Sequence, residues 1–267
     1  MKGLKPRTPM DSVWIAVAIG LAATTAWAGD LSVDNLNVLQ DSRTFGAFTV
    51  IQGDAPTNRP VLYFSFDQEA SAGMVPDESL HGNNGMVIGG AWTNTGPYGG
   101  AYVFGGVTTQ YLEVAGSSTL NMSTGITMAG WVYYLGEGVG NGFVFSKKYG
   151  SGLSYGIMRY NSSRGSDAHK FVASMYAGSW GDYVADYVLT NDVWYFLAAT
   201  YDCQNLKMYV NGALVQTHGE TTAISGDSSG RLTVCADANA PTWSEFTHAI
   251  VDEICLYDYA LSEPAIG

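Results

Sequence analysis

The stretch that decides the fold is VDEICLYDYALS, residues 251–262, close to the C-terminus. Val251, Ile254 and Leu256 give it an apolar frame, and polar residues lie on either side of that frame. A short apolar run with polar bounds is typical of a buried β-strand. Residues 257–262 have the composition of a turn that folds back on the body of the protein. A closing strand needs partners earlier in the chain, so the preceding sequence should supply further strands.

The composition favours a β-rich protein. Of the 267 residues, 46% are hydrophobic, only 13% are charged, and 33 are glycine. That apolar content can bury a sizeable core, and abundant Gly and Tyr favour strands and tight turns over helices. Many short strands, with turn signals about every 8–12 residues and no helical period, predict a sandwich or barrel. The formal net charge of −12 argues against nucleic acid as a partner, because phosphate binding requires a basic face.

Residues 1–28 have the pattern of a secretory signal peptide. Basic residues precede an apolar run at 13–23, and Ala-Trp-Ala at 26–28 supplies a small-x-small cleavage signature. The apolar run is shorter than the ~20 residues that span a bilayer. An uncleaved N-terminal anchor is the alternative. We therefore expect a secreted protein, extracellular or at the cell surface, without a membrane span in its mature chain.

Residues 29–59 are expected to form an N-terminal β extension and linker. Residues 31–39 and 45–51 both alternate apolar and polar side chains, which is typical of amphipathic strands. A two-stranded unit is marginally stable alone. It should therefore pack on the main domain or self-associate with another subunit through residues 31–51. An ordinary extra hairpin is the simpler alternative.

Residues 60–267 resemble the laminin-G-like jelly-roll domains of the concanavalin A-like lectin/glucanase superfamily. The matching motifs occur in the family's order: GGAYVFGG at 99–106, ITMAGWV at 126–132, WYFLAATYD at 194–202, LKMYVNG at 206–212, and the closing stretch at 251–262. Tyr195 and Phe196 replace the family's usual histidines, and Cys235 replaces its usual glycine. The resemblance implies an all-β, two-sheet antiparallel β-sandwich. Strand alternation directs Ile126, Met128 and Val132 to the core. We also expect three aromatic residues in the core: Trp131, Trp194 and Phe196.

The sequence shows no pattern of catalytic residues. Glucanases of this superfamily place several carboxylates on one face of a strand, where alternate positions point the same way. Asp252 and Glu253 are adjacent and should point to opposite faces, while Asp182 and Asp186 lack a third acid nearby. The four histidines form no group with Ser and Asp, and no phosphate-binding glycine loop occurs. We predict that the protein is not an enzyme.

A structural calcium ion is a plausible cofactor. Calcium prefers six to eight oxygen ligands, and the resemblance implies it because many laminin-G-like domains hold one. The first and last strands of a sandwich commonly lie side by side, which would gather oxygen donors from both. The candidate ligands are Asp67, Asp77, Asn83 and Asp252. Turn hydrogen bonding by Asp77 and Asn83 is the alternative role.

The variable region at 149–187 is the expected ligand site. Sugars bind on exposed aromatic faces flanked by polar side chains, because their C–H faces are apolar while their hydroxyls need partners. The candidate residues are Tyr155, Tyr160, Trp180, Asp182 and Tyr183, with Trp243 in a later loop. A Tyr-rich sheet face without any ligand is the alternative.

These observations together predict a secreted, non-catalytic binding module that recognises a carbohydrate or an extracellular protein at the cell surface, as in adhesion. One alternative is a structural subunit of an extracellular filament or coat, assembled through the N-terminal strands. Another is an accessory domain of a larger secreted enzyme. Export would permit a disulfide, but three cysteines, Cys203, Cys235 and Cys255, leave at least one thiol over, and the pairing stays open.

Overall fold

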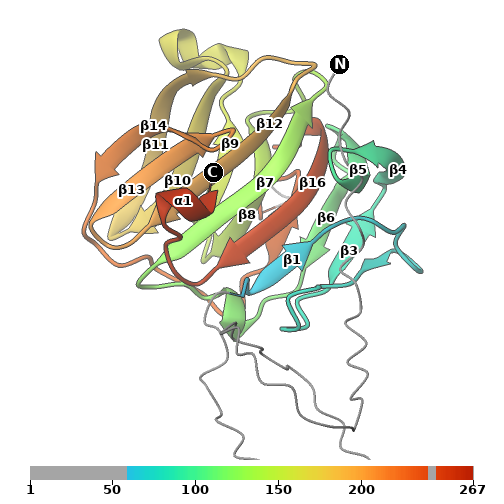
Figure 1. The fold of residues 1–267 in the computed structure, drawn as a ribbon, viewed down its shortest axis with the longest axis horizontal. Helices are drawn as coiled ribbons and strands as arrows, with labels where there is room; N and C mark the ends of the chain where they lie inside the picture. The colour runs from blue at the N-terminus through green and yellow to red at the C-terminus, as the bar shows by residue number, and fades with distance from the viewer. Residues whose placement is uncertain (1–58, 240–244, 267) are drawn as a thin grey trace, which may run out of the picture. The chain divides into compact units, whose positions relative to one another are not determined.

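The computed structural model describes residues 59–239 and 245–266, which form two antiparallel sheets packed face to face (Figure 1). The expected signal peptide, the N-terminal extension and Trp243 lie outside the described residues. The two-sheet sandwich expected from the strand pattern is confirmed. Helical segments are short: η1 (Ser118–Leu120), η2 (Ser162–Asp167) and α1 (Glu263–Ile266).

Sheet A lies in front in Figure 1 and has the order β14-β13-β12-β7-β16-β5-β4, with β1 also pairing with β16. Its strands are β1 (Leu62–Phe64), β4 (Ala91–Gly96), β5 (Gly99–Gly105), β7 (Ile126–Tyr134), β12 (Trp194–Tyr201), β13 (Asn205–Val210), β14 (Ala213–Gly219) and β16 (His248–Tyr257).

Sheet B lies behind sheet A and has the order β11-β10-β9-β8-β15-β6-β3-β2. Its strands are β2 (Met74–Val75), β3 (Gly85–Ile88), β6 (Tyr111–Val114), β8 (Gly142–Tyr149), β9 (Gly152–Arg159), β10 (Lys170–Ala177), β11 (Ser179–Val188) and β15 (Leu232–Val234).

The predicted closing strand is confirmed as β16, in the middle of sheet A. Val251 pairs with Val132 of β7 and with Tyr102 of β5, while Leu256 pairs with Met128 of β7 and with Leu62 of β1. Of the strands that the structure describes, the last one, β16, therefore pairs with both the first, β1, and the central strand β7.

The turn after β16 folds back as expected. The Thr127 hydroxyl donates a hydrogen bond to the Tyr259 carbonyl and accepts one from the Leu261 amide, each at 2.8 Å. Thr127 is fully buried, and its hydroxyl satisfies two backbone groups of the turn.

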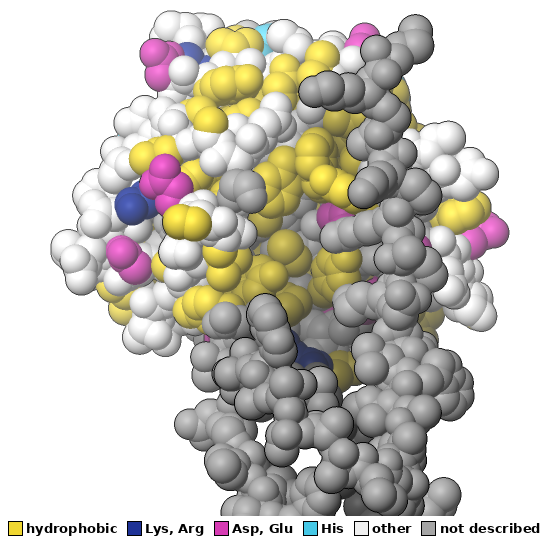
Figure 2. Space-filling view, viewed as in Figure 1, with side chains coloured by type: hydrophobic (Ala, Val, Ile, Leu, Met, Phe, Trp, Pro, Cys, Tyr) yellow, Lys and Arg dark blue, Asp and Glu magenta, His cyan; other side chains and the backbone are white. Residues whose placement is uncertain are grey.

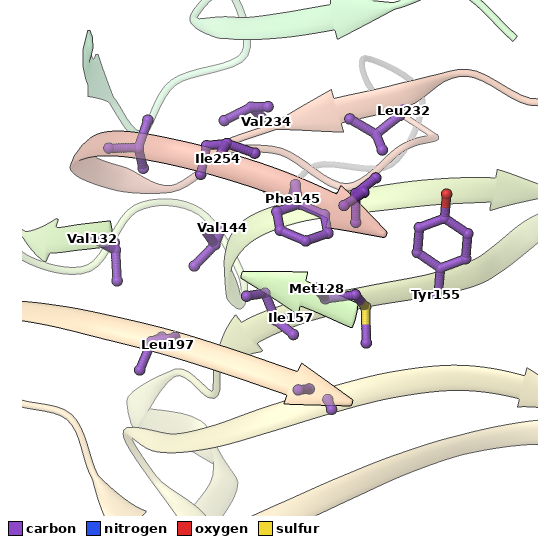
Figure 3. Packing of buried hydrophobic residues seen from close by; sticks show 14 of the residues in the cluster. Met128, Val132, Val144, Phe145, Tyr155, Ile157, Leu197, Leu232, Val234 and Ile254 are labelled. Atoms are coloured by element: carbon purple, nitrogen blue, oxygen red, sulfur yellow. The ribbon is translucent and has the colours of Figure 1, made fainter. Parts of the chain in front are cut away.

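The core lies between the sheets, where apolar side chains from both inner faces meet (Figure 3). Ile126, Met128 and Val132 are fully buried there, as predicted from strand alternation. Full burial of each large apolar side chain contributes about 1.5–3 kcal/mol. The residues labelled in the figure are Met128, Val132, Leu197 and Ile254 from sheet A, and Val144, Phe145, Tyr155, Ile157, Leu232 and Val234 from sheet B.

The prediction that Trp131, Trp194 and Phe196 are core residues was wrong. Val132 and Leu197 occupy the inward positions, so their neighbours in sequence point to the outer face of sheet A. Phe196 pairs with Trp131, and their ring centroids lie 5.6 Å apart. Figure 2 shows hydrophobic side chains gathered on this side, over β12, β7 and β16. We call it the sheet A aromatic face, made of Tyr98, Trp131, Tyr133, Trp194 and Phe196.

The three cysteines form no disulfide in the structure. Cys235 is fully buried, whereas Cys203 and Cys255 are partly buried. Among the described residues, no helix has the length and apolar content that crossing a bilayer requires.

Candidate functional site

A cavity of about 600 Å³ opens on the outer face of sheet B. We call it the sheet B pocket. Its floor contains Phe143, Leu153 and Met158, which belong to a small apolar cluster separate from the main core. Side chains from β8 to β11 and from the segments after β15 form its walls.

Strand alternation explains which side chains of β10 and β11 reach this pocket. Phe171, Ala173 and Met175 point into the core and are fully buried, so the residues between them point outward. The hairpin register then pairs Tyr176 with Trp180 and Ser174 with Asp182 on the outer face. The turn between Ala177 and Ser179 is Gly178, whose φ of +70° suits glycine.

Aromatic side chains form one wall of the sheet B pocket. Trp180 is 42% exposed, although a side chain of this size is usually well buried. Its cross-strand neighbour Tyr176 packs against Tyr149, with ring centroids 5.1 Å apart. All three residues line the pocket. An exposed indole beside two phenol rings is an apolar platform bordered by hydroxyl groups.

Asp182 is held beside this wall by two hydroxyl groups. Ser174 donates to one carboxylate oxygen at 2.6 Å, and Tyr160 donates to the other at 2.7 Å. Burial, together with the hydrogen bond to Asp182, raises the pKa of Tyr160, so its hydroxyl stays a donor. Arg164 lies over the Tyr160 ring, 4.4 Å from its centroid, and also lines the pocket.

Two further carboxylates lie at the pocket. Asp237 accepts a hydrogen bond from the Asn239 amide at 2.6 Å, and its own amide donates to the Glu245 carbonyl at 2.9 Å. The Glu245 carboxylate accepts from the side-chain amide of Asn141 at 3.0 Å. Burial raises the pKa of both carboxyl groups, and the nearby charges of Asp237 and Asp182 raise that of Glu245 further.

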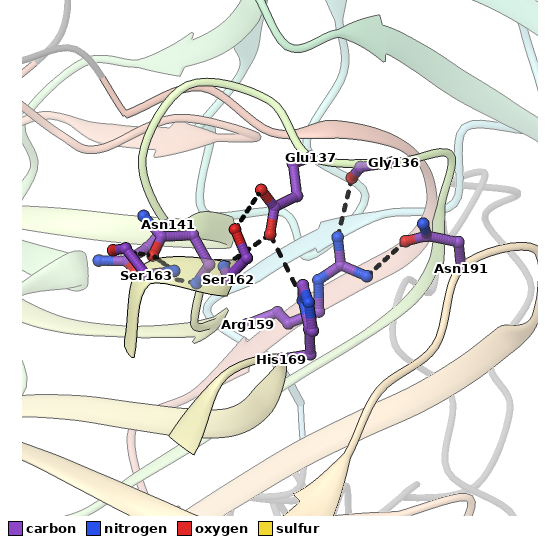
Figure 4. Close-up of polar contacts among 9 residues, drawn as sticks. Gly136, Glu137, Asn141, Arg159, Ser162, Ser163, His169 and Asn191 are labelled. Atoms are coloured by element: carbon purple, nitrogen blue, oxygen red, sulfur yellow. Dashed lines mark hydrogen bonds and ion pairs between the residues drawn. The ribbon is translucent and has the colours of Figure 1, made fainter. Parts of the chain in front are cut away.

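A hydrogen-bond network fixes the rim of the pocket at η2 (Figure 4). Glu137 accepts from the Ser162 amide at 2.6 Å and from its hydroxyl at 2.9 Å, while Asn141 accepts from the Asn161 amide at 3.2 Å. The buried Arg159 donates to Asn191 at 2.7 Å. These bonds hold the loop that presents Arg164.

The same network is not a catalytic triad. Glu137 bonds to Ser162 and lies 3.6 Å from the His169 ring, so the carboxylate stands between the hydroxyl and the imidazole. Activation of a serine requires the imidazole to bond to the hydroxyl, with the acid behind it. The geometry suits bracing of a loop rather than nucleophilic attack.

Two of the predicted ligand residues, Trp180 and Asp182, line the pocket, and Tyr160 reaches it through its bond to Asp182. Tyr155 lies in the core instead, fully buried, with its hydroxyl donating to the Leu120 carbonyl. Tyr183 alternates with Asp182, so it packs toward the main core and donates to Glu220. These two placements correct the expectation that Tyr155 and Tyr183 belong to the ligand site.

Sequence reasoning missed Asp237, Glu245 and Asn141. They come from loops far apart in the chain, and no motif spacing connects them with Trp180. The available signal was the run Asp-Ala-Asn at 237–239, a set of oxygen donors directly after a buried strand.

Asp77 and Asn83, two of the calcium candidates, are engaged in local hydrogen bonds. The Asp77 carboxylate accepts from the amides of Tyr63, Ser79 and Asn83, and from the Ser79 hydroxyl, at 2.8–3.0 Å. The side chain of Asn83 donates to the carbonyl of Val61 at 2.7 Å. Both residues therefore have the turn-stabilising role that was the alternative for them.

Asp67 and Asp252 both lie against the turn between β4 and β5. Asp252 is fully buried and accepts from the amides of Tyr98 and Glu253, while Asp67 accepts from the Gly100 amide. Burial, then the charges of Glu253 and Asp67, raises the pKa of Asp252 to about 7.

The two carboxylates supply oxygen atoms of the kind that calcium prefers. In the described part of the chain, no three acidic, histidine or cysteine side chains gather as a metal group. Backbone or water oxygens would have to complete the coordination shell.

The laminin G model of the concanavalin A-like lectin/glucanases superfamily matches residues 104–267. No curated protein sequence matches the chain. The family match covers β7, β12 and β16, which form the middle of sheet A, and also the strands that form the sheet B pocket.

Solved structures share the fold at low identity. Domain 4 of AbnA, an extracellular GH43 arabinanase from Geobacillus stearothermophilus in complex with arabinotriose, is 16% identical with a TM-score of 0.61; the match covers 78% of this chain and 96% of that one. The binding domain of botulinum neurotoxin DC in complex with rat synaptotagmin II is 12% identical with a TM-score of 0.59, and the match covers 79% and 51%.

The Trypanosoma rangeli sialidase is 14% identical with a TM-score of 0.54, and the match covers 77% of this chain and 31% of that one. The chain thus spans about half of the neurotoxin domain and about a third of the sialidase. At such identities the likeness concerns the fold alone.

Proposed function

Since the chain belongs to the concanavalin A-like lectin/glucanases superfamily, we propose that it is a non-catalytic module that binds a carbohydrate in the sheet B pocket. The observation behind the proposal is the exposed indole of Trp180 next to the fixed carboxylate of Asp182. A sugar ring has an apolar C–H face that can lie on the indole, while its hydroxyls donate to the carboxylate.

The fixed position of Asp182 favours binding. Ser174 and Tyr160 already hold the carboxylate, so a ligand does not have to order it. Each carboxylate oxygen accepts one of these bonds and keeps further acceptor capacity for a sugar hydroxyl. Preorganised groups of this kind reduce the entropy that binding costs.

The structural relatives are consistent with this class of ligand. The arabinanase domain is in complex with arabinotriose, and a binding domain of botulinum neurotoxin serotype D is in complex with N-acetylneuraminic acid. The neurotoxin DC domain in complex with rat synaptotagmin II illustrates the alternative, an extracellular protein partner. We place the module outside the cell, as the pattern of residues 1–28 predicts, with calcium as a structural ion at Asp67 and Asp252.

A glycan array followed by calorimetry of the best oligosaccharide tests the proposal on the full-length chain. Trp180→Ala should weaken binding by about 10- to 100-fold, because stacking on one aromatic ring is worth about 1–3 kcal/mol. Trp194→Ala is the matched control, since it removes a partly exposed indole from the sheet A aromatic face. Equal losses in both variants, or no glycan binding at all, would refute the proposed site.

A second candidate function is glycoside hydrolysis. Asp237 and Glu245 favour it, because they place two carboxyl groups at the same pocket, and burial shifts the pKa of both in the direction typical of a general acid. Prolonged incubation of the bound oligosaccharide, with chromatography of the products, separates the two functions. We expect the oligosaccharide to stay intact; cleavage that Glu245→Gln abolishes would establish catalysis instead.

A further inference from the structure

The charge of the sheet B pocket narrows the class of sugar that it can hold. Three carboxylates line it, from Asp182, Asp237 and Glu245, against one cationic side chain among the described lining residues, Arg164. Asp237 is only 9% exposed, so its carboxylate is poorly hydrated. Acidic side chains therefore outnumber basic ones among the described residues that line the cavity.

Arg164, the one cationic side chain among the described lining residues, is already engaged. The Arg164 guanidinium lies over the Tyr160 ring, and that ring donates its hydroxyl to Asp182. An anionic ligand would have to compete for Arg164 while approaching the carboxyl groups of Asp182, Asp237 and Glu245. Partly desolvated like charges repel strongly, because the surrounding protein screens them less than water does.

We propose that the sheet B pocket selects uncharged sugar residues and rejects acidic ones such as sialic or uronic acids. The inference rests on the proposed function and specifies its ligand class. Asp182 and Glu245 act as acceptors for sugar hydroxyls, and the same oxygens repel a sugar carboxylate. The Glu245 oxygen opposite the one bonded to Asn141 accepts no hydrogen bond from the described residues, so it can receive a hydroxyl.

The fold gives these carboxylates a fixed arrangement. Asp182 lies on β11 opposite Ser174 of β10, and Asp237 lies three residues after the end of β15. The backbone bond from the Asp237 amide to the Glu245 carbonyl ties the two loop segments together. A ligand therefore cannot displace Asp237 without also displacing the segment that carries Glu245.

The test compares matched pairs of oligosaccharides that differ only in a carboxylate: a uronic acid against the parent hexose, and a sialylated glycan against its asialo form. Binding to the full-length chain is measured by calorimetry at low and high ionic strength. The neutral member should bind at least about tenfold more tightly, and added salt should reduce the difference.

The variant Glu245→Gln, alone and with Asp237→Asn, should bring the acidic sugar to within about threefold of the neutral one. Asp186→Asn is the control, because it removes the same charge from an exposed site on β11 and should leave the discrimination intact. Arg164→Gln should increase the difference in affinity between neutral and acidic sugars, because it removes a positive charge from the pocket lining. Thermal unfolding of each variant verifies that it is folded.

Equal or tighter binding of the acidic sugars would overturn the inference and leave carbohydrate binding standing. So would discrimination that persists unchanged in the folded double variant. The absence of binding by both members of every pair would instead refute the proposed function itself.

Discussion

Lys147 offers a quantitative test of the sandwich, because its ammonium group is buried at one end of the core. The residue is 1% exposed, and the ammonium donates to the Asp227 carbonyl at 2.5 Å and to the Lys148 carbonyl at 3.4 Å. Burial lowers the pKa of Lys147 from 10.5 to about 8, partly offset by attraction to Asp227. We predict that Lys147→Met stabilises the protein at pH 7.

The magnitude follows from that lowering. At about 1.4 kcal/mol per pH unit, the difference between 10.5 and about 8 corresponds to a cost of about 3 kcal/mol for keeping the ammonium charged in the fold. Methionine fills similar space without a charge, but the Asp227 carbonyl loses its donor, at about 1 kcal/mol. The expected net gain is therefore about 2 kcal/mol.

The pH dependence of the stability difference between Lys147→Met and the wild type is a second test of the prediction. Below about pH 8 the ammonium is charged in both the folded and the unfolded chain, so its full cost is present. Between about pH 8 and 10.5 the unfolded chain binds more protons, so the wild type gains stability as pH rises. The advantage of Lys147→Met should shrink by about 1 kcal/mol from pH 7 to pH 9.

Urea unfolding of the wild type and the variant at pH 7 and pH 9 measures this difference. The tyrosines titrate in both proteins alike, so their contribution cancels when the two are compared. Lys148→Met, at the neighbouring and more exposed residue, serves as the control. A variant less stable than the wild type at pH 7, or an advantage that does not change with pH, would refute the reasoning.

Other parts of the structure lead to three further predictions. Thr127→Val should lower the free energy of unfolding, measured in urea, by about 1–3 kcal/mol, because it removes the hydroxyl that satisfies the backbone of Tyr259 and Leu261. Thr217→Val, at an exposed residue of β14, is the control and should change the free energy of unfolding little. Ile254→Ala, at the centre of the core, should cost about 2–5 kcal/mol by the same measurement, and a loss below 1 kcal/mol would show that β16 is not packed as described. Millimolar calcium should raise the melting temperature of the wild type but not that of Asp252→Asn. Asp186→Asn, at an exposed residue, is the control and should show the same rise as the wild type. If calcium does not change the melting temperature of the wild type, the protein does not bind the ion.

The sequence contained enough information for the sandwich, because hydrophobic alternation and closing motifs are local. The apolar pattern of residues 251–262 predicts the closing strand, and alternation predicts that Val132 points inward. Alternation alone does not say which side of a strand faces the other sheet, and aromatic size favoured the wrong side for Trp131 and Trp194. Their neighbours Val132 and Tyr195 face the core, while Trp131 packs on Phe196, and Trp194 packs on Tyr133, on the outer face.

The candidate site was predictable only in part, for the same reason. A Tyr-rich stretch with Trp180 and Asp182 indicated a binding region, but its composition does not assign faces. Trp180 and Tyr183 are three positions apart on β11, so their side chains point to opposite faces of the strand, and Tyr183 points inward. Asp237 and Glu245 join the pocket through tertiary packing of loops, which no spacing in the chain reveals.

A crystal structure of the full-length chain with the tightest-binding oligosaccharide tests the central claim most directly. The account predicts a sugar ring on the indole of Trp180, with hydroxyl groups within hydrogen-bond distance of Asp182 and Glu245. Density for the sugar on the sheet A aromatic face, over Trp194 and Phe196, with the sheet B pocket holding only solvent, would contradict it.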